Sequence, residues 1–262
     1  MRTLLAAVTF VVMTVVCALI AIVARLLGVR EGPGSIYDRV PRWWAQSVLT
    51  AAGAKVVVHG AERIVPGDPH IFVSNHVSWF DVLALVVSLP QYSFVAKAEL
   101  FRIPIFGAGA RAVGTIPIER ENRKAAFQAY EEAAVCIRTG RNVVVYPEGT
   151  RGPSYALRPF KKGPFVLAIA AGVPIIPTII HGTIHINPRG TLRARPGRID
   201  IHLLDPVATE GLSYDDRDAL SRAVYDRMAE GFERLYGVHS PPYPTPPAAR
   251  SNGTARAVAD GE

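Results

Sequence analysis

Apolar and polar residues along the chain first form one long uncharged run. Residues 4–24 carry no Asp, Glu, Lys or Arg, and a membrane-spanning helix needs about 20 apolar residues. Arg2 alone precedes this run, whereas several arginines follow it: Arg25, Arg30, Arg39 and Arg42. Positive charge gathers on the cytoplasmic side of a membrane helix. We therefore expect a helix anchored in the cell membrane with the following domain facing the cytoplasm. A cleaved signal peptide is the alternative, but the run is too long and no Ala-x-Ala site closes it.

The next segment is amphipathic and lies at residues 36–54. Trp43 and Trp44 stand beside arginines there, a combination typical of the headgroup region of a bilayer. Its apolar part is too short to cross a membrane. A helix packed on the folded domain is the alternative. Residues 1–54 are thus predicted to form a pair of membrane-anchoring helices.

From residue 55 onward, short apolar runs of strand type alternate with longer runs of helical type. The alternation predicts an α/β domain at residues 55–237, with a mixed, largely parallel sheet flanked by helices. The predicted strands are 55–59, 70–73, 93–96, 115–118, 142–146, 175–180 and 199–204, and the predicted helices are 78–89, 100–110, 123–138, 163–171 and 215–236. Residues 238–262 are rich in Pro, Ala, Gly and Ser, and we expect a disordered tail there.

Composition narrows the possible partners only slightly. The chain has 29 Lys and Arg against 22 Asp and Glu, a net charge of +7, which suits an anionic lipid, a phosphorylated substrate or nucleic acid. The basic residues are scattered and no nucleic-acid-binding module is visible, so nucleic acid is not expected. The two cysteines predict no disulfide. His181 and His185 are four residues apart, but without a Glu after His181 we expect no metal site.

Candidate chemistry lies in the stretch Ser74-Asn75-His76-Val77-Ser78-Trp79-Phe80-Asp81, which joins a buried strand to a helix. Open α/β sheets carry their chemistry at the carboxyl ends of strands, and a histidine there can accept a proton near neutral pH. Asp81 can reach His76 only if the histidine stands outside the helix, as an N-cap at Ser78 would place it. Ser78 and Asp81 also fit a capping box, in which Asp81 only satisfies backbone donors.

The pattern Asn-His-x-Ser-x-x-Asp resembles the first signature of the glycerolipid acyltransferases, a family that includes lysophosphatidic acid acyltransferase. Three further signatures follow in the family's order: Gly-Thr-Ile-Pro-Ile-Glu-Arg at 114–120, Tyr-Pro-Glu-Gly-Thr-Arg at 146–151 and Val-Pro-Ile-Ile-Pro at 173–177. The resemblance covers roughly residues 55–205. Tyr146 stands where the family often has Phe, and Gly152 where Ser is common, and neither change removes a proposed chemical group.

The resemblance implies roles for particular residues. His76 would be the general base and Asp81 would fix its tautomer, so that the acceptor hydroxyl attacks directly and no acyl-enzyme forms. The glycerol phosphate of the acceptor would bind Arg120, Glu148, Gly149, Thr150 and Arg151. Arg120 and Arg151 each follow a strand, and we expect them at neighbouring strand ends, gripping one phosphate. Glu148 would bind acceptor hydroxyls or position Arg151.

The sequence therefore predicts a membrane-bound O-acyltransferase that converts lysophosphatidic acid to phosphatidic acid. Acyl-coenzyme A or acyl carrier protein would be the co-substrate, and no cofactor is expected. Two alternatives stay open: an acyltransferase for another lysophospholipid or lipid hydroxyl, and a non-catalytic lipid-binding protein with the same fold.

Overall fold

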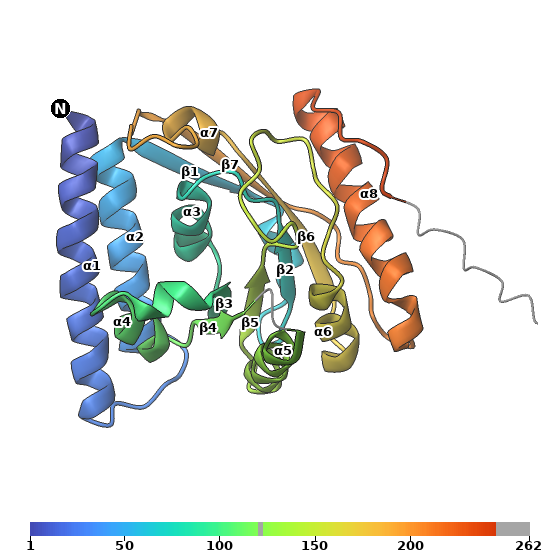
Figure 1. The fold of residues 1–262 in the computed structure, drawn as a ribbon, viewed down its shortest axis with the longest axis horizontal. Helices are drawn as coiled ribbons and strands as arrows, with labels where there is room; N and C mark the ends of the chain where they lie inside the picture. The colour runs from blue at the N-terminus through green and yellow to red at the C-terminus, as the bar shows by residue number, and fades with distance from the viewer. Residues whose placement is uncertain (120–122, 245–262) are drawn as a thin grey trace, which may run out of the picture.

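The computed structural model describes residues 1–119 and 123–244, in which a central sheet lies between two groups of helices (Figure 1). The sheet has seven strands in the order β1-β7-β6-β2-β5-β3-β4. The strands are β1 (Ala54–His59), β2 (Ile71–Ser74), β3 (Tyr92–Lys97), β4 (Ile116–Ile118), β5 (Asn142–Val145), β6 (Ile175–His181) and β7 (Gly197–Leu203). Every pair is parallel except β6 with β7. The predicted mixed, largely parallel sheet is confirmed.

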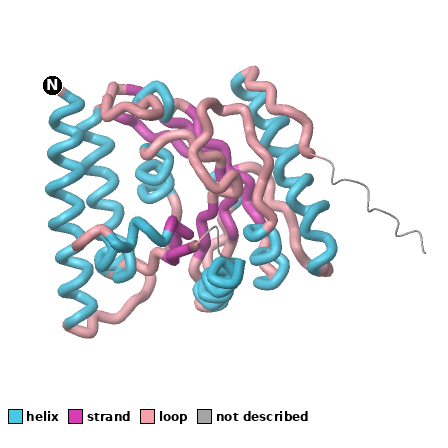
Figure 2. Tube along the Cα trace, viewed as in Figure 1, coloured by secondary structure: helices cyan, strands magenta, loops and turns pink. Residues whose placement is uncertain are grey.

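Helices cover both faces of this sheet, as Figure 2 shows by colour. On one face lie α2 (Ile36–Ala52) and α3 (Phe80–Ser88), and on the other lie α5 (Arg123–Arg138), α6 (Gly163–Ala171) and α8 (Arg217–Tyr236). Side chains of β2 alternate between the two layers: Ile71 and Val73 join the second group, whereas Phe72 joins the first. Because both faces are covered, residues 71–73 of β2 and 143–145 of β5 are all apolar and buried in one of the two layers.

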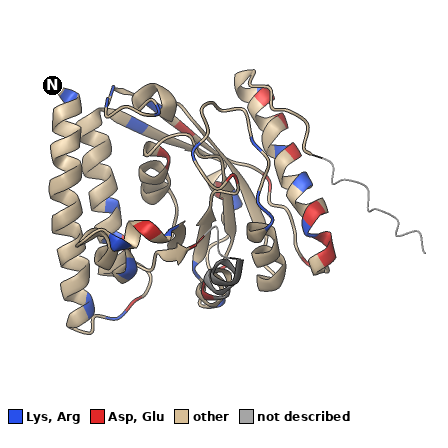
Figure 3. Ribbon diagram, viewed as in Figure 1, with Lys and Arg blue, Asp and Glu red and all other residues tan. Residues whose placement is uncertain are grey.

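The first helix, α1 (Arg2–Leu26), is the one helix of the described residues whose length and composition suit a membrane span. Figure 3 marks charged residues at its two ends and none between, in contrast to α8, which carries residues of both signs along its length. Its buried residues are small (Ala6, Cys17, Ala18, Ala21 and Ala24), whereas many of its large apolar side chains are exposed. The helix therefore packs closely through one side and presents an apolar surface on the other.

Both N-terminal helices are joined to the rest of the domain by specific contacts. Gly109 of α4 (Phe106–Ala112) approaches α1 so closely that a Cβ there would lie 2.5 Å from the Cβ of Ala18. Arg42 of α2 donates from Nη1 to the carbonyl of Val87, at 3.0 Å, and from Nη2 to the carbonyl of Leu89. These carbonyls lie at the carboxyl end of α3, where the helix itself supplies no donors. Arg42 thus caps α3 from the neighbouring helix.

The structure differs from the predicted elements at several places. The helix expected at 100–110 is interrupted: a 3₁₀ helix, η2 (Ala98–Arg102), ends before Pro104, Ile105 takes a left-handed backbone with φ 64°, and α4 follows. Proline disfavours helical geometry in the residue before it, which explains the break. A short helix, α7 (Thr183–Ile186), was not predicted. Two further short 3₁₀ helices are present: η1 (Ala61–Arg63), which was not predicted, and η3 (Tyr214–Asp216), which takes the place of the first turn expected for α8.

The tail expected from residue 238 begins with an ordered segment. Ser240 Oγ accepts from the amide of Leu157 at 3.0 Å, and the carbonyl of Pro241 accepts from the Tyr225 hydroxyl at 2.6 Å. The Tyr243 hydroxyl lies 2.7 Å from Ser221 Oγ. The aromatic ring and these polar partners hold the segment on α8 despite its prolines. Residues 245–262 lie outside the described part of the chain.

Candidate active site

The site forms where two adjacent parallel strands end. β2 pairs with β5, with Val73 opposite Val145, so the segments that follow these strands emerge side by side from one edge of the sheet. The segment after β2 carries His76, and the segment after β5 carries Glu148, Thr150 and Arg151. The two segments are joined directly, since the amide of Gly152 donates to the carbonyl of His76 at 2.7 Å. Two of the predicted signatures thus meet in one place.

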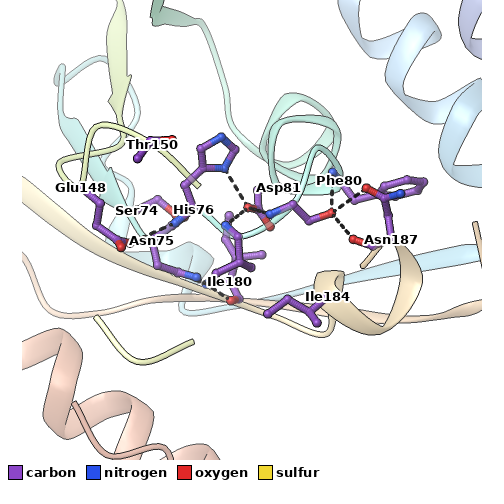
Figure 4. Close-up of polar contacts among 12 residues, drawn as sticks. Ser74, Asn75, His76, Phe80, Asp81, Glu148, Thr150, Ile180, Ile184 and Asn187 are labelled. Carbon is purple, nitrogen blue, oxygen red and sulfur yellow. Dashed lines mark hydrogen bonds and ion pairs between the residues drawn. The ribbon is translucent and has the colours of Figure 1, made fainter. Parts of the chain in front are cut away.

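His76 and Asp81 form a direct pair (Figure 4). The distance from His76 Nδ1 to Asp81 Oδ2 is 2.9 Å. Helix α3 begins at Phe80, so His76 stands outside it, as expected from the sequence. The side chain of Asp81 is fully buried, whereas that of His76 is 15% exposed. The carboxylate is therefore shielded from substrate, whereas a substrate can reach the imidazole.

Asp81 also accepts from the backbone at the start of the helix. The amides of Val77 and Ser78 donate to the same Oδ2 atom, at 2.6 and 2.8 Å. The capping and pairing interpretations of Asp81 therefore both hold, and one oxygen serves both. An Nδ1–H that donates to this oxygen leaves Nε2 with its lone pair. This is the arrangement that a histidine needs to accept a proton at Nε2.

Neighbouring side chains hold the His76 loop in place. The ring of Tyr146 stacks on the imidazole with centroids 4.0 Å apart. The side-chain amide of Asn75 donates to the carbonyl of Ile180 at 3.0 Å and accepts from the Ile180 amide at 2.8 Å. Ser78 Oγ donates to the carbonyl of Asn187 at 3.1 Å. The loop is thereby attached to β5, to β6 and to the segment after α7.

Tyr146 has a buried hydroxyl without a hydrogen-bond partner in the described part of the chain. Burial raises the pKa of this hydroxyl well above its usual value. The tyrosine is therefore neutral, and its ring serves the site as a stacking surface for His76.

Glu148 is engaged by an arginine that sequence reasoning did not pair with it. Its Oε2 lies 2.8 Å from Nε of Arg158, and its Oε1 accepts from the amide of His76 at 3.4 Å. Its side chain is 3% exposed, and this burial raises the pKa of the carboxyl group despite the opposing effect of Arg158. The carboxylate thus holds Arg158 and the His76 loop, and among the described residues no hydrogen bond or ion pair joins it to Arg151. Arg158 also donates to the carbonyl of Thr150.

The guanidinium of Arg151 lies over the ring of Trp79, 4.9 Å from the ring centroid. Gly149, which precedes the Thr150–Arg151 pair, has φ 77°, a conformation that favours glycine. The stem of Lys161 passes beside it, 3.7 Å from where a Cβ would be. The phosphate-binding segment predicted at residues 148–151 is thus a tight turn with basic side chains around it.

The expectation that Arg120 and Arg151 lie at neighbouring strand ends is wrong. β3 lies between β4 and β5 in the sheet, so the strands that lead to Arg120 and to Arg151 do not end next to each other. The sequence could not reveal this, because strand order does not follow chain order in such sheets. Arg120 itself lies outside the described residues.

A second cluster of titratable residues lies on β1 and β7. His59 Nε2 is 2.7 Å from Asp200 Oδ1, and the rings of His59 and His202 stack with centroids 4.3 Å apart. Arg198 binds the same carboxylate through Nε and Nη2, which with His59 lowers the pKa of Asp200 against the effect of burial. The Asp200 charge is thus already neutralised by the chain's own groups. This cluster is separate from the His76 site.

Comparison with known proteins finds the same similarity to acyltransferases that the sequence motifs indicate. Residues 55–181 match the family model described as Acyltransferase. The matched segment contains both the His76–Asp81 pair and Arg151.

Individual relatives share a common description. The chain is 36% identical to the mouse 1-acyl-sn-glycerol-3-phosphate acyltransferase alpha and 35% identical to the human protein of that name, in alignments that cover 70% of this chain. The matched segment spans 65% of the length of each of these relatives. The crystal structure of the 1-acyl-sn-glycerophosphate (LPA) acyltransferase from Thermotoga maritima is similar in fold, with a TM-score of 0.70 and 26% identity over 88% of this chain and 97% of that one.

Proposed function

We propose that the protein transfers a fatty acyl group from an acyl thioester to the free hydroxyl of lysophosphatidic acid, giving phosphatidic acid. The observation that carries the proposal is the His76–Asp81 pair with Nε2 left open, located beside Arg151. The names of the mouse, human and Thermotoga proteins support the same acceptor. The donor is acyl-coenzyme A or acyl carrier protein, and neither acts as a resident cofactor.

In the proposed reaction, the acceptor hydroxyl attacks the thioester carbonyl directly. Nε2 of His76 takes the hydroxyl proton as the new C–O bond forms, and Asp81 stabilises the resulting imidazolium. The tetrahedral species then collapses with cleavage of the C–S bond. The proton held by His76 passes to the leaving thiolate, which restores the neutral imidazole. The atoms balance without a covalent enzyme intermediate.

We assign the acceptor phosphate to Arg151 and place α1 in the bilayer. A guanidinium offers paired N–H groups that match phosphate oxygens, and Arg151 lies in the segment after β5, next to the segment after β2 that carries His76. The exposed apolar side of α1 suits lipid. With the positive charge downstream of α1, the domain would face the cytoplasm. The bilayer and the lysolipid are thus the partners that we expect.

If α1 lies in the bilayer, the protein should stay with membranes washed with high salt and with alkaline carbonate. Both treatments remove proteins held only by charge, whereas burial of an apolar helix survives them. The measurement is the fraction of full-length chain in the membrane pellet. Quantitative release by either wash would show that α1 is not inserted.

The function itself is tested by acyl transfer from labelled acyl-coenzyme A, or acyl carrier protein, to lysolipids that differ in the headgroup. Wild-type protein should prefer lysophosphatidic acid. Arg151→Ala should lower kcat/KM for this acceptor by about ten- to a hundredfold, mainly by raising KM, because hydrogen bonds to charged groups contribute about 1.5–3 kcal/mol. Arg189→Ala, which changes an exposed arginine, is the matched control.

The possible results separate the proposals. Transfer by wild type only to a lysolipid without a phosphate monoester would replace the proposed acceptor and leave the chemistry standing. An Arg151→Ala variant with the same acceptor dependence as wild type would remove Arg151 from the phosphate site. Absence of transfer with every donor and acceptor would favour a lipid-binding protein.

A further inference from the structure

Trp79 is an exposed aromatic residue inside the segment that carries His76 and Asp81. It precedes α3 directly, and 48% of its surface is exposed. Its neighbours in the same segment have evident tasks: Phe80 is buried in the core, and Ser78 binds Asn187. A large exposed apolar ring next to a catalytic pair is not explained by packing. What the ring does contact is the guanidinium of Arg151.

The contact leaves the hydrogen-bonding capacity of Arg151 unused. Within the described residues, the Arg151 side chain makes no ion pair and no hydrogen bond. Nearby cations differ: Arg158 pairs with Glu148, and Lys162 pairs with Asp218. A guanidinium over an aromatic ring is attracted by the electrons of the ring face, and this contact uses none of its five N–H donors. Trp79 can therefore orient Arg151 without occupying the groups that a phosphate would bind.

The contact also links the two halves of the site. Trp79 belongs to the segment after β2, and Arg151 to the segment after β5. Because Trp79 lies only three positions from His76, the ring ties the position of the guanidinium to that of the imidazole. An acceptor held by its phosphate would then present its hydroxyl at a fixed distance from Nε2. Such placement is what raises the rate of a reaction between two bound groups.

We propose that Trp79 is a positioning residue that holds Arg151 ready for the phosphate monoester of the acceptor. The proposal rests on the proposed function only in that the ligand carries a phosphate monoester. Trp79 acts through Arg151, and its contribution disappears when the arginine is absent.

A double-mutant cycle tests this dependence with the full-length protein in detergent. Trp79→Leu keeps an apolar side chain but removes the ring face, and it should raise KM for lysophosphatidic acid by about three- to tenfold, in line with a cation–π contact. Trp79→Phe, which retains a weaker ring, should restore part of this loss. In an Arg151→Ala background, Trp79→Leu should add less than about twofold, since coupled residues are not additive. Equal effects in both backgrounds would overturn the proposal.

A binding measurement separates this inference from the proposed reaction. Addition of sn-glycerol 3-phosphate should change the tryptophan fluorescence of the wild type, and the change should be lost in Trp79→Phe and in Arg151→Ala. Trp43→Phe, which removes another exposed tryptophan, should retain it. Loss of wild-type transfer to lysophosphatidic acid with this pattern intact would reject the reaction and keep the Trp79–Arg151 site. A fluorescence change that survives in Arg151→Ala would reject the site.

Discussion

Replacing His76 by alanine is expected to lower kcat for acyl transfer by about 10²–10⁴-fold, the range that a positioned general base contributes. Among the described residues, the imidazole is the one titratable side chain that Asp81 orients, and its Nε2 is the atom left open to substrate. Removal of the ring takes away the proton acceptor but not Arg151, so binding of the phosphate should change far less than turnover. Initial rates at saturating acceptor and donor give kcat directly.

Two comparisons make the His76 result specific. His185→Ala changes an exposed histidine on α7 and should keep wild-type turnover. The fluorescence response to sn-glycerol 3-phosphate should persist in His76→Ala and show that the site is still folded. Turnover by His76→Ala within tenfold of wild type would exclude His76 as the base and require another group to take the hydroxyl proton.

Asp81→Asn is expected to lower kcat by about 10²–10⁴-fold as well, because loss of the buried carboxylate removes both the tautomer control and the charge that stabilises the imidazolium. The Asn amide can present an N–H where His76 Nδ1 now donates, which favours the wrong tautomer. The backbone amides of Val77 and Ser78 also lose their carboxylate acceptor. Some loss of stability should therefore accompany the loss of rate.

The control for Asp81 must separate catalysis from helix capping. Ser78→Ala removes the hydroxyl that accepts from the Phe80 amide at 3.3 Å and donates to the Asn187 carbonyl at 3.1 Å, so it loosens the loop and the helix start but leaves the His76–Asp81 hydrogen bond in place. Thermal unfolding and kcat should be measured for both variants. A loss of rate in Asp81→Asn with most of the protein folded supports the proton-transfer role. If activity in both variants follows only the folded fraction, Asp81 is a helix cap and nothing more.

Local pattern predicted the strands of this protein closely. The runs at 70–73 and 142–146 became the two adjacent central strands, because the apolar residues at 71–73 and 143–145 are compatible with a strand covered on both faces. The His76–Asp81 pair followed from the strand-to-helix change around it and from resemblance to a known family. The order of the strands did not follow, since the pairing of β6 with β7 and the place of β3 depend on contacts between distant segments.

The contacts that the sequence did not predict are mainly those between loops. Arg158 is ten positions from Glu148, across a segment without regular structure, and spacing in such a segment carries no information about which charges meet. Trp79 lies inside the first signature at a position that the signature leaves unspecified, and its partner Arg151 belongs to the third. Pro104 did offer a signal for the break between η2 and α4, because proline rarely occurs inside a helix. Pro104 alone therefore predicts that the helix expected at 100–110 is broken into two parts.

The cap that Arg42 places on α3 links the N-terminal helices to the position of His76. Because α2 binds the end of α3, and α1 contacts Gly109 of α4, the N-terminal helices and the helix that carries Asp81 are packed together. With α1 in lipid, the imidazole would be held at a fixed height above the membrane surface. Its encounters with acceptor would then occur in two dimensions, and the governing concentration would be the mole fraction of lysolipid in the surrounding leaflet. Dilution of the bilayer with inert phospholipid, and not dilution of the buffer, would set the pace of the reaction.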